Sequence, residues 1–213
     1  MQAQCNNMKK IVIASGNAGK LREFSAMFSS HFTNEKIEVI PQNEFNVEEA
    51  EENGLSFVEN AIIKARNAAR QTGLPALADD SGIEVDAIQG APGIYSARYA
   101  SRAGYQGSER GDAANNAMLL QALAAVPQAE RSARFQCVLV YMRHAEDPTP
   151  QVFQGSWEGR ILVHPEGSEG FGYDPLFFVE SENCTAAELS KEHKNRISHR
   201  GSAMQQLIRN IKL

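Results

Sequence analysis

The chain has 213 residues, of which 42% are hydrophobic and 22% charged, and its formal net charge is −5. A chain of this length can bury a core without covalent cross-links, and its ordinary composition excludes disordered and fibrous proteins. The acidic balance, with no run of five basic residues, disfavours a nucleic-acid-binding protein, which usually has a basic surface. A phosphate ligand would have to be held by a few local cations and a metal.

The three cysteines, Cys5, Cys137 and Cys184, have no paired spacing, so neither a disulfide framework nor a cysteine zinc site is expected. No apolar stretch approaches the roughly 20 residues of a membrane-spanning helix, and the first residues lack the apolar core of a signal peptide. We therefore expect no membrane contact and a cytoplasmic location. Residues 1–7 are expected to be a disordered extension.

In the first half of the chain, short β-branched runs alternate with segments of helical periodicity. We expect strands at residues 9–14, 36–40 and 75–78, the last leading into residues 79–82 with residues 83–86 beyond, and helices at residues 18–32 and 55–71. An acidic loop precedes the second of these helices, and Gly73 and Pro75 mark its end.

In the second half, residues 88–107 are rich in glycine and proline and should be irregular. The pattern then predicts a helix at 112–126, strands at 134–144, 151–163 and 176–179, a glycine-rich loop at 167–175, and helices from 186 and from 198. The two long strands are joined by a turn and form a hairpin that fits a second lobe. A strand–helix–strand start followed by a hairpin predicts an α/β fold, with a mixed sheet flanked by helices.

The first candidate site is the glycine-rich turn between the first strand and the first helix. Backbone N–H groups at a helix N-terminus bind anions, glycine allows close approach, and Lys20 adds a full charge. The P-loop pattern G-x-x-x-x-G-K-[ST] fails at both ends, where Ala14 and Leu21 stand. An ordinary glycine turn with a surface lysine is the alternative. The candidate phosphate-binding residues are Ser15, Gly16, Asn17, Ala18, Gly19 and Lys20.

The second candidate is the sequence Asp-Asp-Ser-Gly at residues 79–82, at the C-terminal end of a predicted strand, where open α/β sheets keep their sites. Neighbouring side chains on a strand point to opposite faces, so one aspartate can face a cleft. That carboxylate could hold Mg²⁺ or accept a proton from water. An Asx-type turn before Gly82 is the alternative.

Acidic residues before the second helix form the third candidate. Glu51 or Glu52 could complete a magnesium site with Asp80, while Lys64 lies further along the helix. A glutamate run in this place is otherwise a solvated face that complements the helix dipole.

Two further motifs lie near the C-terminus. The loop at 171–175 could stack an aromatic ring on a base and read the edge of the base with a carboxylate, although a turn with buried aromatics has the same pattern. Ser198 can cap the last helix, which puts His199 and Arg200 in its first turn. Cations there oppose the helix dipole, which favours an anionic or electronegative ligand over a plain surface pair.

Together and in this order, the motifs closely resemble the inosine triphosphate pyrophosphatase family, the XTP/dITP diphosphatases, and most of all its bacterial branch. The likeness extends from residue 8 to the C-terminus, and this chain has Ser15 where many relatives have threonine, which keeps the hydroxyl. The matching segments are residues 15–20, 59–64, 78–82, 90–98, 171–174 and 198–200.

The resemblance implies a single catalytic domain over residues 8–213, with an elongated mixed sheet, two lobes and the active cleft between them. It implies a Mg²⁺-dependent homodimer that converts ITP, dITP and XTP to the monophosphate and pyrophosphate. Asp80 would be the proton acceptor and a metal ligand, with Glu52, rather than Glu51, as the second ligand. The implied substrate-binding residues are Ser15, Gly16, Asn17, Ala18, Gly19, Lys20, Lys64, Ser81, Phe171, Gly172, Tyr173, Asp174, Lys194, His199 and Arg200.

The implied chemistry agrees with the residue types. Lys20, Lys64 and a metal can offset the charge of a triphosphate, and Asp80 beside a cation should stay ionised and act as a modest base. Donors that meet O6 of a purine would be left unpaired by adenine, at about 1–3 kcal/mol each. Three rivals remain: a pyrophosphatase for modified pyrimidines, a nucleotide sensor without turnover that does not need Asp80, and the disfavoured nucleic-acid binder.

Overall fold

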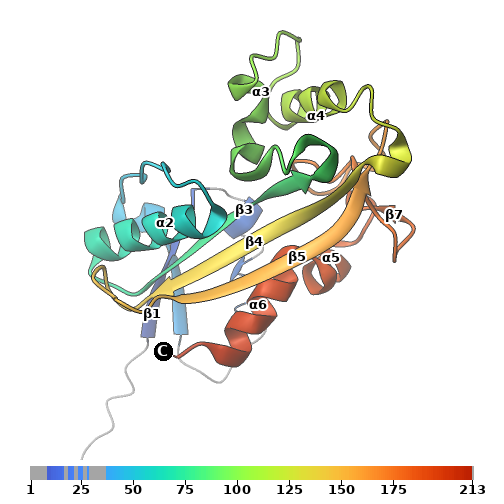
Figure 1. Ribbon diagram of the computed structural model, residues 1–213. Coiled ribbons are helices and arrows are strands. Elements are labelled where there is room, and N and C mark those ends of the chain that lie inside the picture. The colour runs from blue at the N-terminus through green and yellow to red at the C-terminus, as the bar shows by residue number, and fades with distance from the viewer. Residues whose placement is uncertain (1–8, 17–18, 22–23, 26–27, 29–36, 213) are drawn as a thin grey trace, which may run out of the picture. The chain divides into compact units, whose positions relative to one another are not determined.

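A computed structural model describes the chain except for residues 1–8, 17–18, 22–23, 26–27, 29–36 and 213 (Figure 1). The predicted extension at residues 1–7 therefore lies outside the described residues, as do Asn17 and Ala18 of the glycine-rich turn. Within the predicted first helix, the described positions 19–21, 24–25 and 28 are helical.

In the described part of the chain, the strands form one mixed sheet in the order β2-β1-β3-β4-β5-β6-β7. β1 pairs in parallel with β2 and with β3, whereas β6 is antiparallel to both β5 and β7. The predicted mixed sheet is therefore confirmed. The strands are β1 (Lys9–Ala14), β2 (Ile37–Pro41), β3 (Ala76–Val85), β4 (Ser132–Met142), β5 (Gln151–Ile161), β6 (Phe177–Val179) and β7 (Cys184–Thr185).

Helices surround this sheet, as the sequence pattern predicted. α2 and α6 are amphipathic, and short 3₁₀ turns connect several elements. The α-helices are α2 (Phe57–Thr72), α3 (Tyr99–Arg102), α4 (Gly111–Ala122), α5 (Lys191–Ile197) and α6 (His199–Asn210). The 3₁₀ turns are η1 (Gln42–Phe45), η2 (Asp86–Ile88), η3 (Gly93–Arg98) and η4 (Gln128–Glu130).

The chain divides into two compact units, each with its own core. The first unit comprises Met1–Asp80, Val138–Phe153 and Met204–Leu213, and the second comprises Ser81–Cys137 and Gln154–Ala203. The predicted hairpin of β4 and β5 contributes to both units, so it does not form a lobe by itself.

The core of the first unit depends on small residues. Buried alanines of α2, among them Ala61, Ala65 and Ala68, pack on apolar side chains of β1, β3 and β4, and a helix with so small a face can lie close to the sheet. Ser56 caps the helix by accepting from the Glu59 N–H, and the Glu59 carboxylate accepts from Ser56 Oγ in return. These contacts fix where α2 begins.

The core of the second unit is aromatic. Phe135 of β4, Trp157 of β5 and Phe177 of β6 are all buried, and their ring centroids lie 4.6 to 6.4 Å apart. Aromatic rings bury large apolar areas and prefer such offset or tilted contacts. Phe135 and Trp157 of this cluster stack on His199, the first residue of α6.

The segment containing Asp79 and Asp80 differs from the prediction. A short strand at residues 75–78 was expected, with a turn before Gly82 as the alternative, but β3 runs without a break from Ala76 to Val85, so the Asx-turn alternative is wrong. The segment stays extended because it is buried on both faces and its carboxylates have cationic partners.

Smaller differences concern element ends. The region at 88–107, predicted to be irregular, contains η3 and the short helix α3. The helix predicted at 112–126 ends at Ala122, and the helical piece predicted from residue 186 begins as α5 at Lys191.

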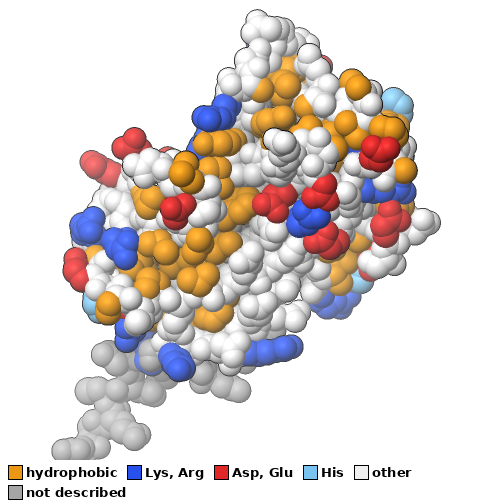
Figure 2. All heavy atoms as spheres, viewed as in Figure 1, with side chains coloured by type: hydrophobic (Ala, Val, Ile, Leu, Met, Phe, Trp, Pro, Cys, Tyr) orange, Lys and Arg blue, Asp and Glu red, His pale blue; other side chains and the backbone are white. Residues whose placement is uncertain are grey.

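The described helices include none that is long and apolar enough to cross a membrane. On the face shown in Figure 2, basic and acidic side chains are interspersed among apolar ones. Among the ion pairs of the described residues, Arg134 contacts both Asp86 and Glu158.

Candidate functional site

Two neighbouring aspartates of β3 each pair with a lysine in the first unit. Lys20 Nζ lies 2.5 Å from Asp79 Oδ2, and Lys64 Nζ lies 2.6 Å from Asp80 Oδ1. Glu52 approaches the same Lys64 ammonium at 3.6 Å. Asp79 and Asp80 are adjacent on a strand, so their side chains point to opposite faces. Each therefore meets a lysine from a different helical segment. The structure thus forms two ion-pair groups at neighbouring positions of β3, Lys64 with Asp80 and Glu52, and Lys20 with Asp79, and the charges of the two groups influence each other.

The loop that carries Glu52 is fastened to the first turn of α2. The Gly54 N–H donates to Asn60 Oδ1 at 2.9 Å, and the Leu55 N–H donates to Glu59 Oε2 at 2.9 Å. Gly54 lies so close to α2 that a Cβ there would be 2.7 Å from Asn60 Oδ1. Asn60 is fully buried and lies one helical turn before Lys64, so the loop and the lysine share one rigid support.

The electrostatics make Asp80 a better base than an exposed aspartate. Burial raises the pKa of Asp80 above its ordinary value, and the nearby Lys64 ammonium only partly offsets this effect. Burial works to lower the pKa of Lys64, but the negative charges of Asp80 and Glu52 outweigh it and raise that pKa. The modest base expected from the sequence is thus strengthened. Asp80 Oδ2 is buried and has no hydrogen-bond partner within the described structure.

The glycine-rich turn is described only in part. Ser15 is buried at the end of β1, and Gly19 and Lys20 are helical, while Asn17 and Ala18 lie outside the described residues. A Cβ on Gly16 would lie 2.8 Å from Glu49 Oε1, a neighbour that the sequence did not indicate. Phosphate binding by this turn stays a prediction.

A second cluster, in the second unit, surrounds the ring of Phe171. Lys194 Nζ lies 5.4 Å from the ring centroid and Arg200 Cζ lies 5.2 Å from it. Asp174 Oδ2 accepts from both Lys194 Nζ, at 2.5 Å, and the Phe171 N–H, at 2.9 Å. A buried ammonium is stabilised by this carboxylate and by the face of the ring.

The loop between these residues is held by hydrogen bonds to α4 and to the core. The Gly172 N–H donates to Asp112, and Asn116 donates to the Gly172 carbonyl. Tyr173 is buried and its hydroxyl donates to the Ser96 carbonyl, so this side chain supports the loop, and burial raises its pKa. Ser81, the first residue of the second unit, is partly buried.

Ser198 joins the two C-terminal helices. Its N–H donates to the Lys194 carbonyl at the end of α5, and its Oγ accepts from the Gly201 N–H at the start of α6. The predicted cap is therefore confirmed. His199 and Arg200 follow directly and are 2% and 5% exposed, so the alternative of a surface pair is wrong.

Three residues that the sequence did not single out position His199. Its imidazole is stacked on Phe135, with centroids 4.8 Å apart and planes 11° apart, and faces Trp157 at 6.4 Å and 19°. Gly155 of β5 has no room for a side chain, because a Cβ would lie 2.1 Å from the His199 carbonyl oxygen. Alternation along β4 and β5 predicted only that these positions face a core.

Among the described residues, no group of three or more His, Cys, Asp and Glu side chains is arranged to hold a metal ion. Asp80 and Glu52 are nevertheless close to one another, because both contact Lys64 Nζ. Glu51 is exposed, whereas Glu52 is partly buried and contacts Lys64, which favours Glu52 of the two candidates.

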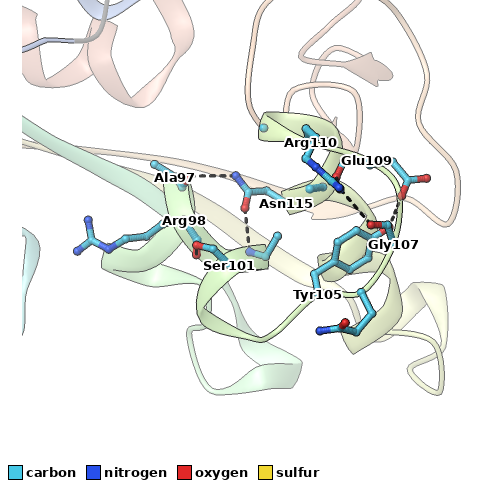
Figure 3. A pocket seen from close by; sticks show the side chains of 12 residues that line it. Ala97, Arg98, Ser101, Tyr105, Gly107, Glu109, Arg110 and Asn115 are labelled. Atoms are coloured by element: carbon cyan, nitrogen blue, oxygen red, sulfur yellow. Dashed lines mark hydrogen bonds between the residues drawn. The ribbon is translucent and has the colours of Figure 1, made fainter.

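A separate pocket of about 460 Å³ in the second unit contains none of the predicted site residues (Figure 3). Asn115 bridges the Ala97 carbonyl and the Ala100 N–H, and Arg110 donates to carbonyls of its own loop. Figure 3 shows these polar groups directed at the protein rather than into the pocket.

Residues 11–210 match the sequence profile of the Ham1 family. The chain belongs to the Ham1 family. One Ham1 relative, the dITP/XTP pyrophosphatase of Vibrio cholerae, is 56% identical over 204 residues, which are 96% of this chain and 97% of the relative. The protein of the same name from Escherichia coli O157:H7 is 55% identical over 201 residues, 94% of this chain and 97% of the relative.

Solved Ham1 structures agree with the fold. A HAM1 protein from Coxiella burnetii has a TM-score of 0.85 at 49% identity, over 95% of this chain and 98% of that chain. A nucleoside-triphosphatase, or dITP/XTP pyrophosphatase, from Mycobacterium abscessus has a TM-score of 0.71 at 41% identity, over 93% and 97% of the two chains. The predicted fold and the resemblance to the XTP/dITP diphosphatases are confirmed.

Proposed function

We propose that this chain hydrolyses non-standard purine nucleoside triphosphates, namely dITP, XTP and ITP, to the monophosphate and pyrophosphate. The names of its relatives, which it matches over nearly its whole length, support the substrate class. The observation that carries the proposal is the pair of ion-pair groups on β3, in which the buried Asp80 contacts the partly buried Lys64, also approached by Glu52, and the buried Asp79 contacts Lys20. Such groups have the base and the cations that hydrolysis of a polyphosphate requires.

Asp80 is the proton acceptor in this proposal. Its raised pKa and its unpartnered Oδ2 make it able to take a proton from an attacking water. Lys64 and Lys20 would exchange part of their contact with carboxylates for contact with phosphate oxygens, whose charge they offset. The glycine-rich turn at residues 15–20 would contribute backbone N–H donors.

A divalent cation fits this donor set. Mg²⁺ prefers one or two carboxylates together with substrate phosphates, and Asp80 and Glu52 are two carboxylates that approach a common cation. These two residues would hold the ion, which when bound would polarise the phosphate oxygens. We accordingly propose Mg²⁺ as the cofactor.

The second cluster is proposed to bind the base and the sugar. Lys194, His199 and Arg200 are buried donors, and Lys194 and Arg200 lie over the face of Phe171, an arrangement that suits a ring with an electronegative edge. Donors that meet O6 would favour a 6-oxo purine over adenine, since adenine would leave them unpaired. Asp174 keeps Lys194 in place.

A product assay tests the proposal. Purified protein is incubated with Mg²⁺ and ITP, dITP, XTP, ATP or GTP, and the released phosphates are separated. Pyrophosphate from the first three substrates is expected, whereas release of orthophosphate would refute the reaction and equal turnover of ATP would refute the selectivity. An Asp80→Asn variant that binds ITP without hydrolysing it distinguishes the enzyme from a nucleotide sensor, because a sensor has no activity to lose.

We also propose that the protein works as a homodimer in the cytoplasm. Light scattering after size-exclusion chromatography would measure its mass in solution against the 23.4 kDa of one chain. A mass equal to one chain at micromolar concentration would contradict the dimer.

A further inference from the structure

The imidazole of His199 lies in an aromatic enclosure built by the sheet of the second unit. Phe135 and Trp157 come from β4 and β5 and approach the ring at 4.8 and 6.4 Å, with planes within 11° and 19° of parallel. The ring of Phe177 is tilted against both Phe135 and Trp157, with centroid distances of 4.6 and 5.3 Å. The imidazole therefore has flat neighbours that match its own plane.

This packing restricts a rotation that histidine otherwise makes freely. The torsion between Cβ and an aromatic ring has broad, shallow minima, so its angle is set by surrounding atoms rather than by the backbone. His199 is 2% exposed, and Gly155 lies directly against its carbonyl, so neither the ring nor the backbone has free space. Turning the imidazole would push it edge-on into Phe135.

The direction of the ring matters because the two nitrogens of a neutral imidazole differ. One nitrogen donates a hydrogen bond and the other accepts one, and hydrogen bonds weaken steeply as the donor angle falls below about 120°. A ring held in one plane keeps its edge N–H aimed at a base along one direction, whereas a ring that can turn loses this alignment and weakens the hydrogen bond. A 6-oxo purine needs a donor, and adenine needs an acceptor.

We propose that Phe135 and Trp157 are positioning residues that hold the His199 ring at one angle and thereby set the preference for 6-oxo purines over adenine. The inference rests on the proposed function, in which His199 binds the base. It adds residues that touch neither the phosphates nor the proposed metal. Removing the stacked ring should therefore relax selectivity rather than abolish hydrolysis.

The test compares Phe135→Leu with Phe177→Leu. Both variants remove one ring from the same buried cluster and should lose similar thermal stability, but Phe135 is stacked parallel to the imidazole, whereas Phe177 is tilted against Phe135 and Trp157. We expect the ratio of kcat/KM for ITP to that for ATP to fall about tenfold in Phe135→Leu and to stay within twofold of wild type in Phe177→Leu. An equal fall in both variants, or no fall in Phe135→Leu, would overturn the inference. Phe135→Met serves the same comparison if the leucine variant does not fold.

A measurement without nucleotide separates this inference from the proposed function. Ring protons of His199 lie over the face of Phe135, so the ring current should shift their NMR signals upfield. In Phe135→Leu these signals should move downfield and broaden, and in Phe177→Leu they should stay near their wild-type positions. Unchanged His199 signals in Phe135→Leu would contradict the positioning role of Phe135, whichever substrate the enzyme hydrolyses. A wild-type protein that releases no pyrophosphate from ITP would instead contradict the proposed function alone.

Discussion

Replacing Gly155 by alanine should disturb the candidate base site without touching any of its side chains. A Cβ on this residue would lie 2.1 Å from the His199 carbonyl oxygen, 2.6 Å from the Ala203 nitrogen and 3.0 Å from Ser202 Cβ. Two of these atoms belong to the backbone of α6, so no side-chain rotation relieves the overlap. Since non-bonded carbon contacts are comfortable at roughly 3.5 Å, the first turn of α6 must move by about 1 Å.

That displacement sets the expected magnitudes. Overpacking of this kind costs about 1–3 kcal/mol, which corresponds to a fall of roughly 2 to 12 °C in melting temperature for a chain of this size. A shift of about 1 Å in His199 and Arg200 should lower kcat/KM for ITP by about a hundredfold. The backbone of Gly155 is an ordinary part of β5, so alanine has no conformational strain of its own there.

Pyrophosphate release from ITP and thermal unfolding measure the two effects. The matched control is Ser156→Ala, because Ser156 is the next residue of β5 but is exposed, on the opposite face of the strand. The control should behave like wild type in both assays. A Gly155→Ala variant with wild-type activity and melting temperature would show that α6 does not lie directly on β5.

Further predictions concern the first unit. Asp80→Asn should lower hydrolysis at least about a hundredfold in the pyrophosphate assay, because an amide cannot accept the proton from the attacking water. Since a base must be unprotonated, kcat/KM should fall as pH drops through the raised pKa of Asp80, with a midpoint above 3.8; a midpoint at or below that value would contradict the assignment. Hydrogen bonds from Arg143 lower the pKa of Asp147, so its carboxylate stabilises the folded protein above the unfolded pKa of about 3.9 and loses this effect as pH falls through the lowered value. The melting temperature of Asp147→Asn should therefore be lower than wild type at pH 7, and the difference should vanish in strong acid. Asn60→Leu should raise the Mg²⁺ concentration for half-maximal activity by about tenfold, because the loop carrying Glu52 loses its anchor; an unchanged requirement would argue against that anchoring.

Segments with a strong period were predictable from the sequence, and those with mixed character were not. The buried strand β1 and the alanine face of α2 follow from local pattern alone. The continuity of β3 does not, because Asp79, Asp80 and Ser81 have the composition of a turn. What keeps them extended are lysines that are remote in sequence, and a local window contains neither partner.

The candidate site shows the same division between local and distant information. Residue types and motif order made Asp80 and Lys64 candidates, and the structure pairs them, but the sequence did not indicate that Lys20 pairs with Asp79. The burial of His199 could not be predicted for a related reason. Phe135 and Trp157, which cover it, lie tens of residues away in the sequence, on strands whose alternating pattern is that of any core strand. The reactive residue types could be recognised from the sequence, but the contacts that position them could not.

The charges around β3 bear on how a nucleotide reaches the protein. Lys20 and Lys64 contribute two positive charges, while Asp79, Asp80 and Glu52 contribute three negative ones, so these five side chains sum to −1. A group with this net charge does not attract a metal-free nucleoside triphosphate, which carries about four negative charges. It would lower the association rate of that nucleotide. Nucleotide already complexed with a divalent cation is therefore the species suited to productive encounters, and the association rate should depend on ionic strength only weakly.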